Sequence, residues 1–172
     1  MYKFMAVLIA VLTFGSVTST PASAGAHEAR PLKGSLQSEF FVDGTLCNDN
    51  TGLLQKITGS GIASHLGRFK IEGSVCLSET PEPGTVTWTA ANRDTITFLF
   101  VTAVGDVGPD GSATIELVQL EATGTGRFNN VELGPENPIG TVWFADPGGF
   151  SGRLEAEIVD GTISYDASDR SR

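Results

Sequence analysis

The sequence has very few of the side chains that usually carry catalysis or bind metals. It contains two histidines and two cysteines in 172 residues. The histidine count excludes a zinc site with two or three of them, because His27 lies close to the N-terminus. A G-x-S-x-G elbow, a phosphate-binding loop and a dinucleotide fingerprint are also missing from the sequence. We therefore expect no cofactor and no metal.

Helix signals and basic clusters are equally scarce. No window of the sequence shows apolar residues at helical spacing with end caps and without glycine. The chain has 20 acidic and 11 basic residues, for a net charge of −9, and its longest basic cluster is Arg30 and Lys33. Phosphate contacts need clustered Lys and Arg, so nucleic acid is not an expected partner. The acidity is expected to serve solubility.

Long apolar runs are absent apart from one at the N-terminus. Lys3 precedes a short uncharged run, Met5–Phe14, and a segment of small residues ends at Ala22-Ser23-Ala24. This order predicts a signal peptide over residues 1–24, cleaved after Ala24 or alternatively after Ala26. A spanning helix would need about 20 apolar residues. We expect a secreted protein, periplasmic or extracellular, with no membrane association after cleavage.

The remaining length suits one domain with a single core. We assign residues 25–34 to a flexible N-terminal segment, residues 35–166 to the domain and residues 167–172 to a disordered tail. The sequence leaves the oligomeric state open.

The two cysteines, Cys47 and Cys76, predict a disulfide, because an isolated pair in an oxidising compartment is usually bridged. The bridge would close a loop of about 30 residues, for which the chain-entropy model gives about 3–4 kcal/mol of stabilisation. Metal binding and redox chemistry are the alternatives. Neither fits, since no C-x-x-C is present and His65 lies well away in sequence from Cys76.

Alternating runs rich in Thr, Val, Ile and Phe, separated by Gly, Pro, Asn and Asp, predict an all-β fold. Short connections throughout favour a single antiparallel β-barrel of about eight strands, mostly up-and-down, over a sandwich. We predict a bulge at Asp160-Gly161 in the last strand. The predicted strands are Gln37–Asp43, Leu53–Ser64, Arg68–Leu77, Thr85–Ala90, Thr95–Val104, Ser112–Ala122, Arg127–Leu133, Thr141–Phe144 and Leu154–Tyr165.

The tripeptide Gly-Arg-Phe occurs twice, at Gly67–Phe69 and at Gly126–Phe128. In each copy the glycine can turn the chain and the phenylalanine can enter the core as a strand begins. For Arg68 and Arg127 we expect pairing with carboxylates at hairpin ends. The alternative is that they hold an anionic ligand at a barrel mouth, with His65 as a third ligand-binding residue. His65 is more readily explained as a turn residue than as a general base.

Three motifs carry a resemblance to a known group of proteins. They are Gly59-x-Gly61-x-Ala63-Ser64-His65-Leu66-Gly67-Arg68-Phe69, Gly124–Phe128 (GTGRF) and Gly161–Tyr165 (GTISY). In this order they resemble motifs of uncharacterised secreted bacterial β-barrel proteins. The GTGRF hairpin is also similar to one in the allene oxide cyclase and dirigent group of eight-stranded antiparallel barrels. The resemblance implies a barrel fold and, through that group, allows an enzyme acting on a hydrophobic small molecule.

The remaining candidate sites are weaker. Asp106 and Asp110 share one loop and residues 48–50 form another polar cluster, but neither matches a calcium-binding loop, so we expect solvated turns. Glycoside hydrolysis would need two paired carboxylates. Trp88 and Trp143 are expected in the barrel core. The carboxylates on predicted strands are Glu116, Glu121, Glu132, Glu155 and Glu157.

Two functions follow from these features. The first is a non-enzymatic secreted barrel that either binds a small molecule, with a hydrophobic one as the expected partner, or has a structural role. The alternative is an isomerase-like or cyclase-like barrel enzyme acting on a hydrophobic small molecule. The interior discriminates between them, because carriage and catalysis both need a cavity, and catalysis also needs a polar group inside it.

Overall fold

The computed structural model describes residues 28–47, 52–77, 82–134, 138–145 and 150–166. The expected signal peptide, both cleavage sites, His27, the cluster at residues 48–50 and the C-terminal tail lie outside these residues. Within them, no helix is long and apolar enough to cross a bilayer. The strands are β1 (Arg30–Leu46), β2 (Leu53–Ala63), β3 (Gly67–Leu77), β4 (Gly84–Ala90), β5 (Thr95–Val104), β6 (Ser112–Gly124), β7 (Glu132–Leu133), β8 (Ile139–Phe144) and β9 (Ser151–Ser164).

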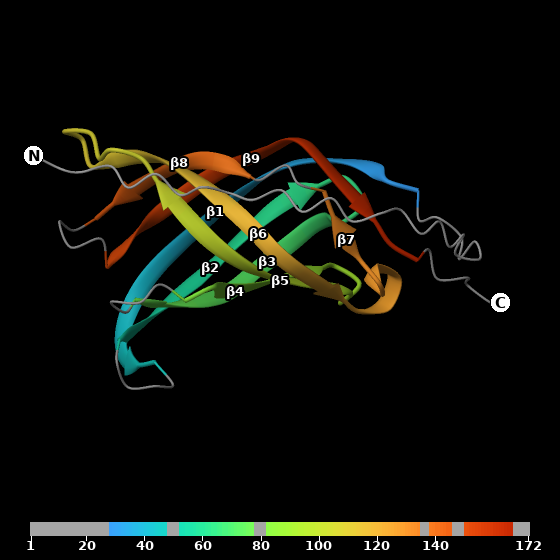
Figure 1. Cartoon of the computed structure of the whole chain (residues 1–172), viewed down its shortest axis with the longest axis horizontal. Helices are drawn as coiled ribbons and strands as arrows, with labels where there is room; N and C mark the ends of the chain where they lie inside the picture. The colour runs from blue at the N-terminus through green and yellow to red at the C-terminus, as the bar shows by residue number, and fades with distance from the viewer. Residues whose placement is uncertain (1–27, 48–51, 78–81, 135–137, 146–149, 167–172) are drawn as a thin grey trace, which may run out of the picture.

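The strands form one antiparallel sheet that closes on itself (Figure 1). The order is β1-β2-β3-β4-β5-β6-β8-β9, and β9 pairs back onto β1, so these eight strands make a barrel. The short strand β7 pairs only with the end of β9. Each barrel strand neighbours the next one along the chain, apart from β7, which is skipped. The prediction of an up-and-down barrel of eight strands is confirmed.

Alternation along the strands decides which side chains enter the barrel. On β4, Val86 and Trp88 are buried while the intervening threonines are more exposed. On β5, Ile96, Phe98 and Phe100 are buried in the same way. A strand with period-two alternation needs a second layer or must curl over, and closure buries every such face in one core.

The strand bounds differ from the prediction at the start of the domain. β1 begins at Arg30 rather than Gln37. Residues 30–34, expected in a flexible segment, therefore lie in a strand. Leu32 is 3% exposed and pairs with Gly161 of β9, so the partner strand orders this region. The irregularity predicted at Asp160-Gly161 is present, since the β1–β9 register shifts between Ile158 and Gly161.

The predicted strand Arg127–Leu133 is wrong over most of its length. Gly126–Phe128 forms a 3-10 turn, and only Glu132–Leu133 is strand. Gly126 has φ +59° and Asn130 has φ +56°, and neither value is compatible with extended backbone. The turn places Phe128, which is fully buried, against the end of the barrel.

The expected disulfide between Cys47 and Cys76 is present, with Cα atoms 5.8 Å apart. Cys47 follows β1 and its N–H donates to the carbonyl of Gly52. Cys76 lies on β3 beside Leu54 of β2. The bond therefore ties the β1–β2 connection to the third strand.

Candidate functional site

The β2–β3 turn is fastened to the start of β1. The Ser64 hydroxyl accepts from the Lys33 N–H at 3.0 Å and donates to the Pro31 carbonyl at 3.0 Å. His65 has φ +70°, which places its ring nitrogen Nε2 3.1 Å from the same Pro31 carbonyl. Leu66 is 3% exposed and packs in the core at this end of the barrel. The motif residues thus join two strands that are about thirty positions apart in sequence.

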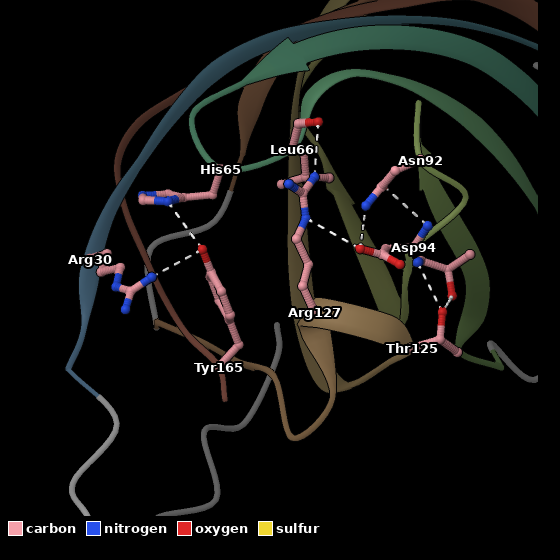
Figure 2. A network of polar contacts seen from close by, with 9 residues as sticks. Arg30, His65, Leu66, Asn92, Asp94, Thr125, Arg127 and Tyr165 are labelled. Carbon is pink, nitrogen blue, oxygen red and sulfur yellow. Dashed lines mark hydrogen bonds and ion pairs between the residues drawn. The ribbon is translucent and has the colours of Figure 1, made fainter. Parts of the chain in front are cut away.

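Tyr165, the last residue of the third motif, meets this turn (Figure 2). Its hydroxyl lies 3.3 Å from His65 Nδ1 and accepts a hydrogen bond of 3.2 Å from Arg30 Nη1. Because Nε2 faces a carbonyl, it carries the ring hydrogen, and Nδ1 is left to accept from the tyrosine hydroxyl. The Tyr165 ring also packs edge-on against Phe128 at 5.2 Å.

Arg127 links the two Gly-Arg-Phe segments. Its Nε lies 3.5 Å from Asp94 Oδ2, and its Nη2 donates to the Leu66 carbonyl at 3.5 Å. Its guanidinium also lies 4.7 Å from the centre of the Phe128 ring. Asn92 Nδ2 donates to the same Asp94 oxygen at 2.5 Å. Figure 2 shows Arg127 between the carbonyl of the first motif and the carboxylate of the β4–β5 turn.

Gly126 is needed because of this carboxylate. A Cβ atom at Gly126 would lie 1.9 Å from Asp94 Oδ1, and the backbone has φ +59°. Beside it, Thr125 Oγ1 accepts from the Thr95 N–H at 3.0 Å. The backbone of the second motif therefore lies in direct contact with the β4–β5 turn. We call Arg30, His65, Asp94, Arg127 and Tyr165 the barrel-end network.

The structure brings together two of the three residues predicted to bind a ligand. His65 and Arg127 belong to the barrel-end network, and Arg127 pairs with a carboxylate as the hairpin-end interpretation expects. Arg68 is exposed on the outer side of β3, opposite Ile62, and is not part of the network. An anion-binding role for these residues stays a prediction.

Sequence reasoning missed three members of the network, namely Arg30, Asp94 and Tyr165. Tyr165 belonged to a recognised motif, but nothing in the sequence linked it to His65, one hundred positions away. Arg30 had been assigned to a flexible segment. The available signal was that Tyr165 closes the third motif.

The contacts of the network join the β2–β3 turn to the start of β1, and Arg127 to the β4–β5 turn. Both ring nitrogens of His65 have partners within the chain, the Pro31 carbonyl and the Tyr165 hydroxyl. The positive charge of Arg127 faces Asp94. Among the described residues, no group of three or more His, Cys, Asp or Glu side chains could hold a metal ion.

The other candidate residues lie on the outside. Glu116, Glu155 and Glu157 share one outer face, whereas Glu121 lies beside Leu99 on the far half of β6. Trp88 is core, as predicted, but Trp143 is not. Trp143 alternates with buried Val142, so its ring is on the outer face, with the Arg153 guanidinium 4.5 Å from its centre.

The β5–β6 loop is held together by its own aspartate. Asp110 Oδ1 accepts from the Ser112 hydroxyl at 2.7 Å and from the Ser112 N–H at 3.1 Å. These hydrogen bonds lower the pKa of the Asp110 carboxyl. The carboxylate therefore completes a turn, as expected of a solvated loop residue.

Comparisons with known proteins give a single distant likeness. No protein-family model matches the chain, and no curated protein matches it. Among solved structures, the chain is similar to a pterocarpan synthase dirigent protein, with 14% identity and a TM-score of 0.39. The match covers 87% of this chain and 98% of that one. The likeness is too distant to transfer a site or an activity, and the barrel is established by the strand pairing itself.

Proposed function

We propose that this chain is an exported, non-enzymatic β-barrel that acts through its outer surface, as a structural or interaction module. The observation that supports this most directly is a packed aromatic cluster in the interior. Trp88 is 2% exposed; its ring stacks on Phe69 at 4.8 Å and meets Phe98 edge-on at 4.9 Å. These three aromatic side chains occupy the space that a carrier or an enzyme would keep for its ligand.

The strands around the aromatic cluster also leave little room. A Cβ atom at Gly61 would lie 2.3 Å from Cζ of Phe69, so a larger residue at this position would clash with the ring. Close packing of this kind is typical of protein cores and not of ligand cavities.

The chemistry of the interior supports the same proposal. Ser38 and Ser164 are the buried polar residues among those described, and no described charged side chain is buried. A cyclase or isomerase would need a polar or charged group beside its substrate. Among the described residues the buried interior offers two serine hydroxyls and no charged group, so we do not favour the alternative of a barrel enzyme.

Export is the second element of the proposal. It is supported by the order of charge, apolar run and small residues at the N-terminus and by the Cys47–Cys76 bond, which suits an oxidising compartment.

Benzene binding tests whether the interior is filled. Methyl resonances of Ile96, Val142 and Ile163, which are all at most 1% exposed, would be followed by NMR as benzene is added. We expect no saturable shift in the native protein. Phe98→Ala is the matched control, because an apolar cavity of about 150 Å3 takes up benzene. If this variant does not fold, Ile163→Ala replaces it.

Saturable benzene binding to the native protein, at the level of the cavity variant, would overturn the proposal and favour carriage of a small molecule. Native mass spectrometry of protein purified from its host gives a second test. A stoichiometric co-purifying small molecule would have the same meaning.

A further inference from the structure

Trp143 lies on the outer face of β8 in a row of polar side chains. The Cα partners across β1, β9, β8 and β6 are Glu39, Arg153, Trp143 and Ser112. The Arg153 guanidinium lies 4.5 Å from the centre of the Trp143 ring. The neighbour of Trp143 on the opposite side, Ser112, has a small side chain. The row therefore sets a cation, an aromatic ring and a carboxylate on adjacent strands.

Arg153 and Glu39 keep their polar groups available. Both residues are exposed, and within the part of the chain that the structure describes no hydrogen bond or ion pair engages either side chain. A guanidinium that lies against a ring still presents the N–H groups at its edge, and an ionised carboxylate accepts through both oxygens. Donors and acceptors thus stand side by side next to Trp143.

Two hollows of the outer surface meet at Trp143, which lines both. One, of about 510 Å3, is also lined by Glu39, Phe41 and Arg153. The other, of about 1610 Å3, continues past Thr141 across the neighbouring strands and is larger than the 300–1,000 Å3 typical of a small-molecule site. Phe41 is 42% exposed on β1, two strands or about 10 Å from Trp143. This surface suits an extended ligand that passes two aromatic rings.

The lining of the larger hollow does not favour a charged ligand. Hydroxyl and amide side chains are spread along it, and charges of both signs stand among them. A polyanion would meet the carboxylates and a polycation would meet the basic groups, so neither is complementary to the whole surface. The acidic residues are Glu116, Glu155, Glu157 and Asp160, and the basic residues are Arg68, Lys70 and Arg93.

We propose that this surface binds a neutral oligosaccharide or polysaccharide. The faces of a sugar ring carry C–H groups, which pack on aromatic side chains such as Trp143 and Phe41. Neighbouring sugar hydroxyls both donate and accept, so one can accept from the Arg153 guanidinium while the next donates to the Glu39 carboxylate. A neutral chain of hydroxyl-bearing rings therefore matches the mixed charges, the aromatic rings and the length of the surface.

The inference rests on the proposed function in that it uses the outer surface as the binding surface. It does not depend on the interior. Benzene uptake by the native protein would overturn the proposed function and leave carbohydrate binding to be judged by its own experiment.

That experiment adds cellohexaose, chitohexaose or mannohexaose to the exported, disulfide-bonded protein and follows the two indole N–H resonances by NMR. We expect a saturable shift of the Trp143 signal with at least one hexasaccharide. Trp88, which is 2% exposed in the core, is the internal control and should not shift. The variant Trp143→Phe assigns the signal, because only the Trp88 resonance remains.

Calorimetry with the same hexasaccharide then measures the contribution of each side chain. Arg153→Met removes the charged donors, and the affinity should fall at least about tenfold. Trp143→Ala should abolish binding. If that variant does not fold, Phe41→Ser replaces it and should also weaken binding. Leu120→Ala is the matched control, since Leu120 is 49% exposed on β6 and lines neither hollow, and it should bind as the native protein does.

Three outcomes would overturn the proposal. The first is the absence of a saturable Trp143 shift with all three hexasaccharides. The second is unchanged affinity in Arg153→Met and Trp143→Ala. The third is a preference for another ligand class, either tighter binding of the acidic hexagalacturonate or a shift with a proline-rich decapeptide alone, which would assign the surface to a protein partner.

Discussion

At the scale of single residues, the repeated Gly-Arg-Phe is a structural device used in two different ways. In the first copy Gly67 has φ +69° and Phe69 enters the barrel from β3. In the second copy the same letters form a 3-10 turn and Phe128 closes the barrel end. The two arginines differ accordingly, since Arg127 pairs with Asp94 whereas Arg68 faces solvent.

Tyr165→Phe tests the barrel-end network. The change removes the hydroxyl between Arg30 and His65 but keeps the ring against Phe128. The loss of a half-buried hydrogen-bonded hydroxyl should lower the free energy of unfolding by about 1 kcal/mol. Thermal melting should show a decrease of about 4 °C. A double-mutant cycle with Arg30→Met should be non-additive. Additive effects would show that the hydroxyl does not couple to Arg30.

Asp43 gives a pH prediction. Hydrogen bonds from Lys56 and then Thr45 hold the pKa of its carboxyl well below the usual range. The ionised form therefore favours the folded state above the ordinary pKa near 4, and this contribution disappears as the pH falls through the lowered value.

Carboxyl chemical shifts recorded against pH should show the low pKa of Asp43, and Lys56→Met should raise it toward the ordinary value. Lys70→Met is the control, because Lys70 lies on another part of the barrel. An unchanged titration of Asp43 in Lys56→Met would contradict the assignment.

At the scale of elements, strand pairing is continuous in the β2–β3 hairpin but irregular near the β1–β2 connection. β2 and β3 pair in continuous register from Leu53↔Leu77 to Ala63↔Gly67. The β1–β2 register shifts between Val42 and Leu46, just before the disulfide. The covalent bond thus holds the strand ends where the ladder becomes irregular.

Replacing Cys47 and Cys76 with serine should lower the free energy of unfolding by about 3–4 kcal/mol, because the unfolded chain regains the freedom of a loop of about 30 residues. Denaturant unfolding measures the change. Alkylation of the native protein without reductant, followed by intact mass, is the control and should detect no free thiol. Labelling of both cysteines would exclude the bond in solution.

At the scale of the whole molecule, the sheet closes into a barrel, and this closure determines which surfaces are exposed. β1 pairs with β9 from Arg30↔Ile163 to Phe41↔Ser151, so the first and last strands complete the barrel. Both edges disappear in this way, which protects a β protein from edge-to-edge association. The outer faces are then the surfaces left for partners.

Hydrogen exchange tests closure. Amides in the middle of β1, such as those of Leu36 and Ser38, should exchange only through global unfolding, with the free energy that denaturant unfolding gives. The short strand β7 is the internal control, since Glu132 and Leu133 pair only with the end of β9 and should exchange by local opening. Faster exchange in β1 than in the β2–β3 hairpin would indicate an open sheet.

Most of the fold could be predicted from sequence because its signal is local. Period-two alternation, turn residues and short connections can be recognised within ten residues, and they predicted the barrel strands to within a few positions, apart from the start of β1. The strand predicted at Arg127–Leu133 was wrong because a positive φ at Gly126, just before it, and another at Asn130, within it, interrupt an otherwise strand-like composition. The prediction that Trp143 lies in the core was wrong because a large aromatic ring can cover an outer face when an arginine stacks on it.

The amino-acid sequence by itself determined the class of fold, the order of the hairpins and the pairing of the two cysteines. The fold class and the order of the hairpins depend on residues that are close in sequence, and two cysteines can pair in only one way. Only the tertiary structure decided that His65, Arg127 and Tyr165 meet at one barrel end, that aromatic rings fill the interior, and that Arg68 and Glu157 share an outer face. Those relations join strands that are far apart in sequence, and the register of a closed barrel is what brings them together.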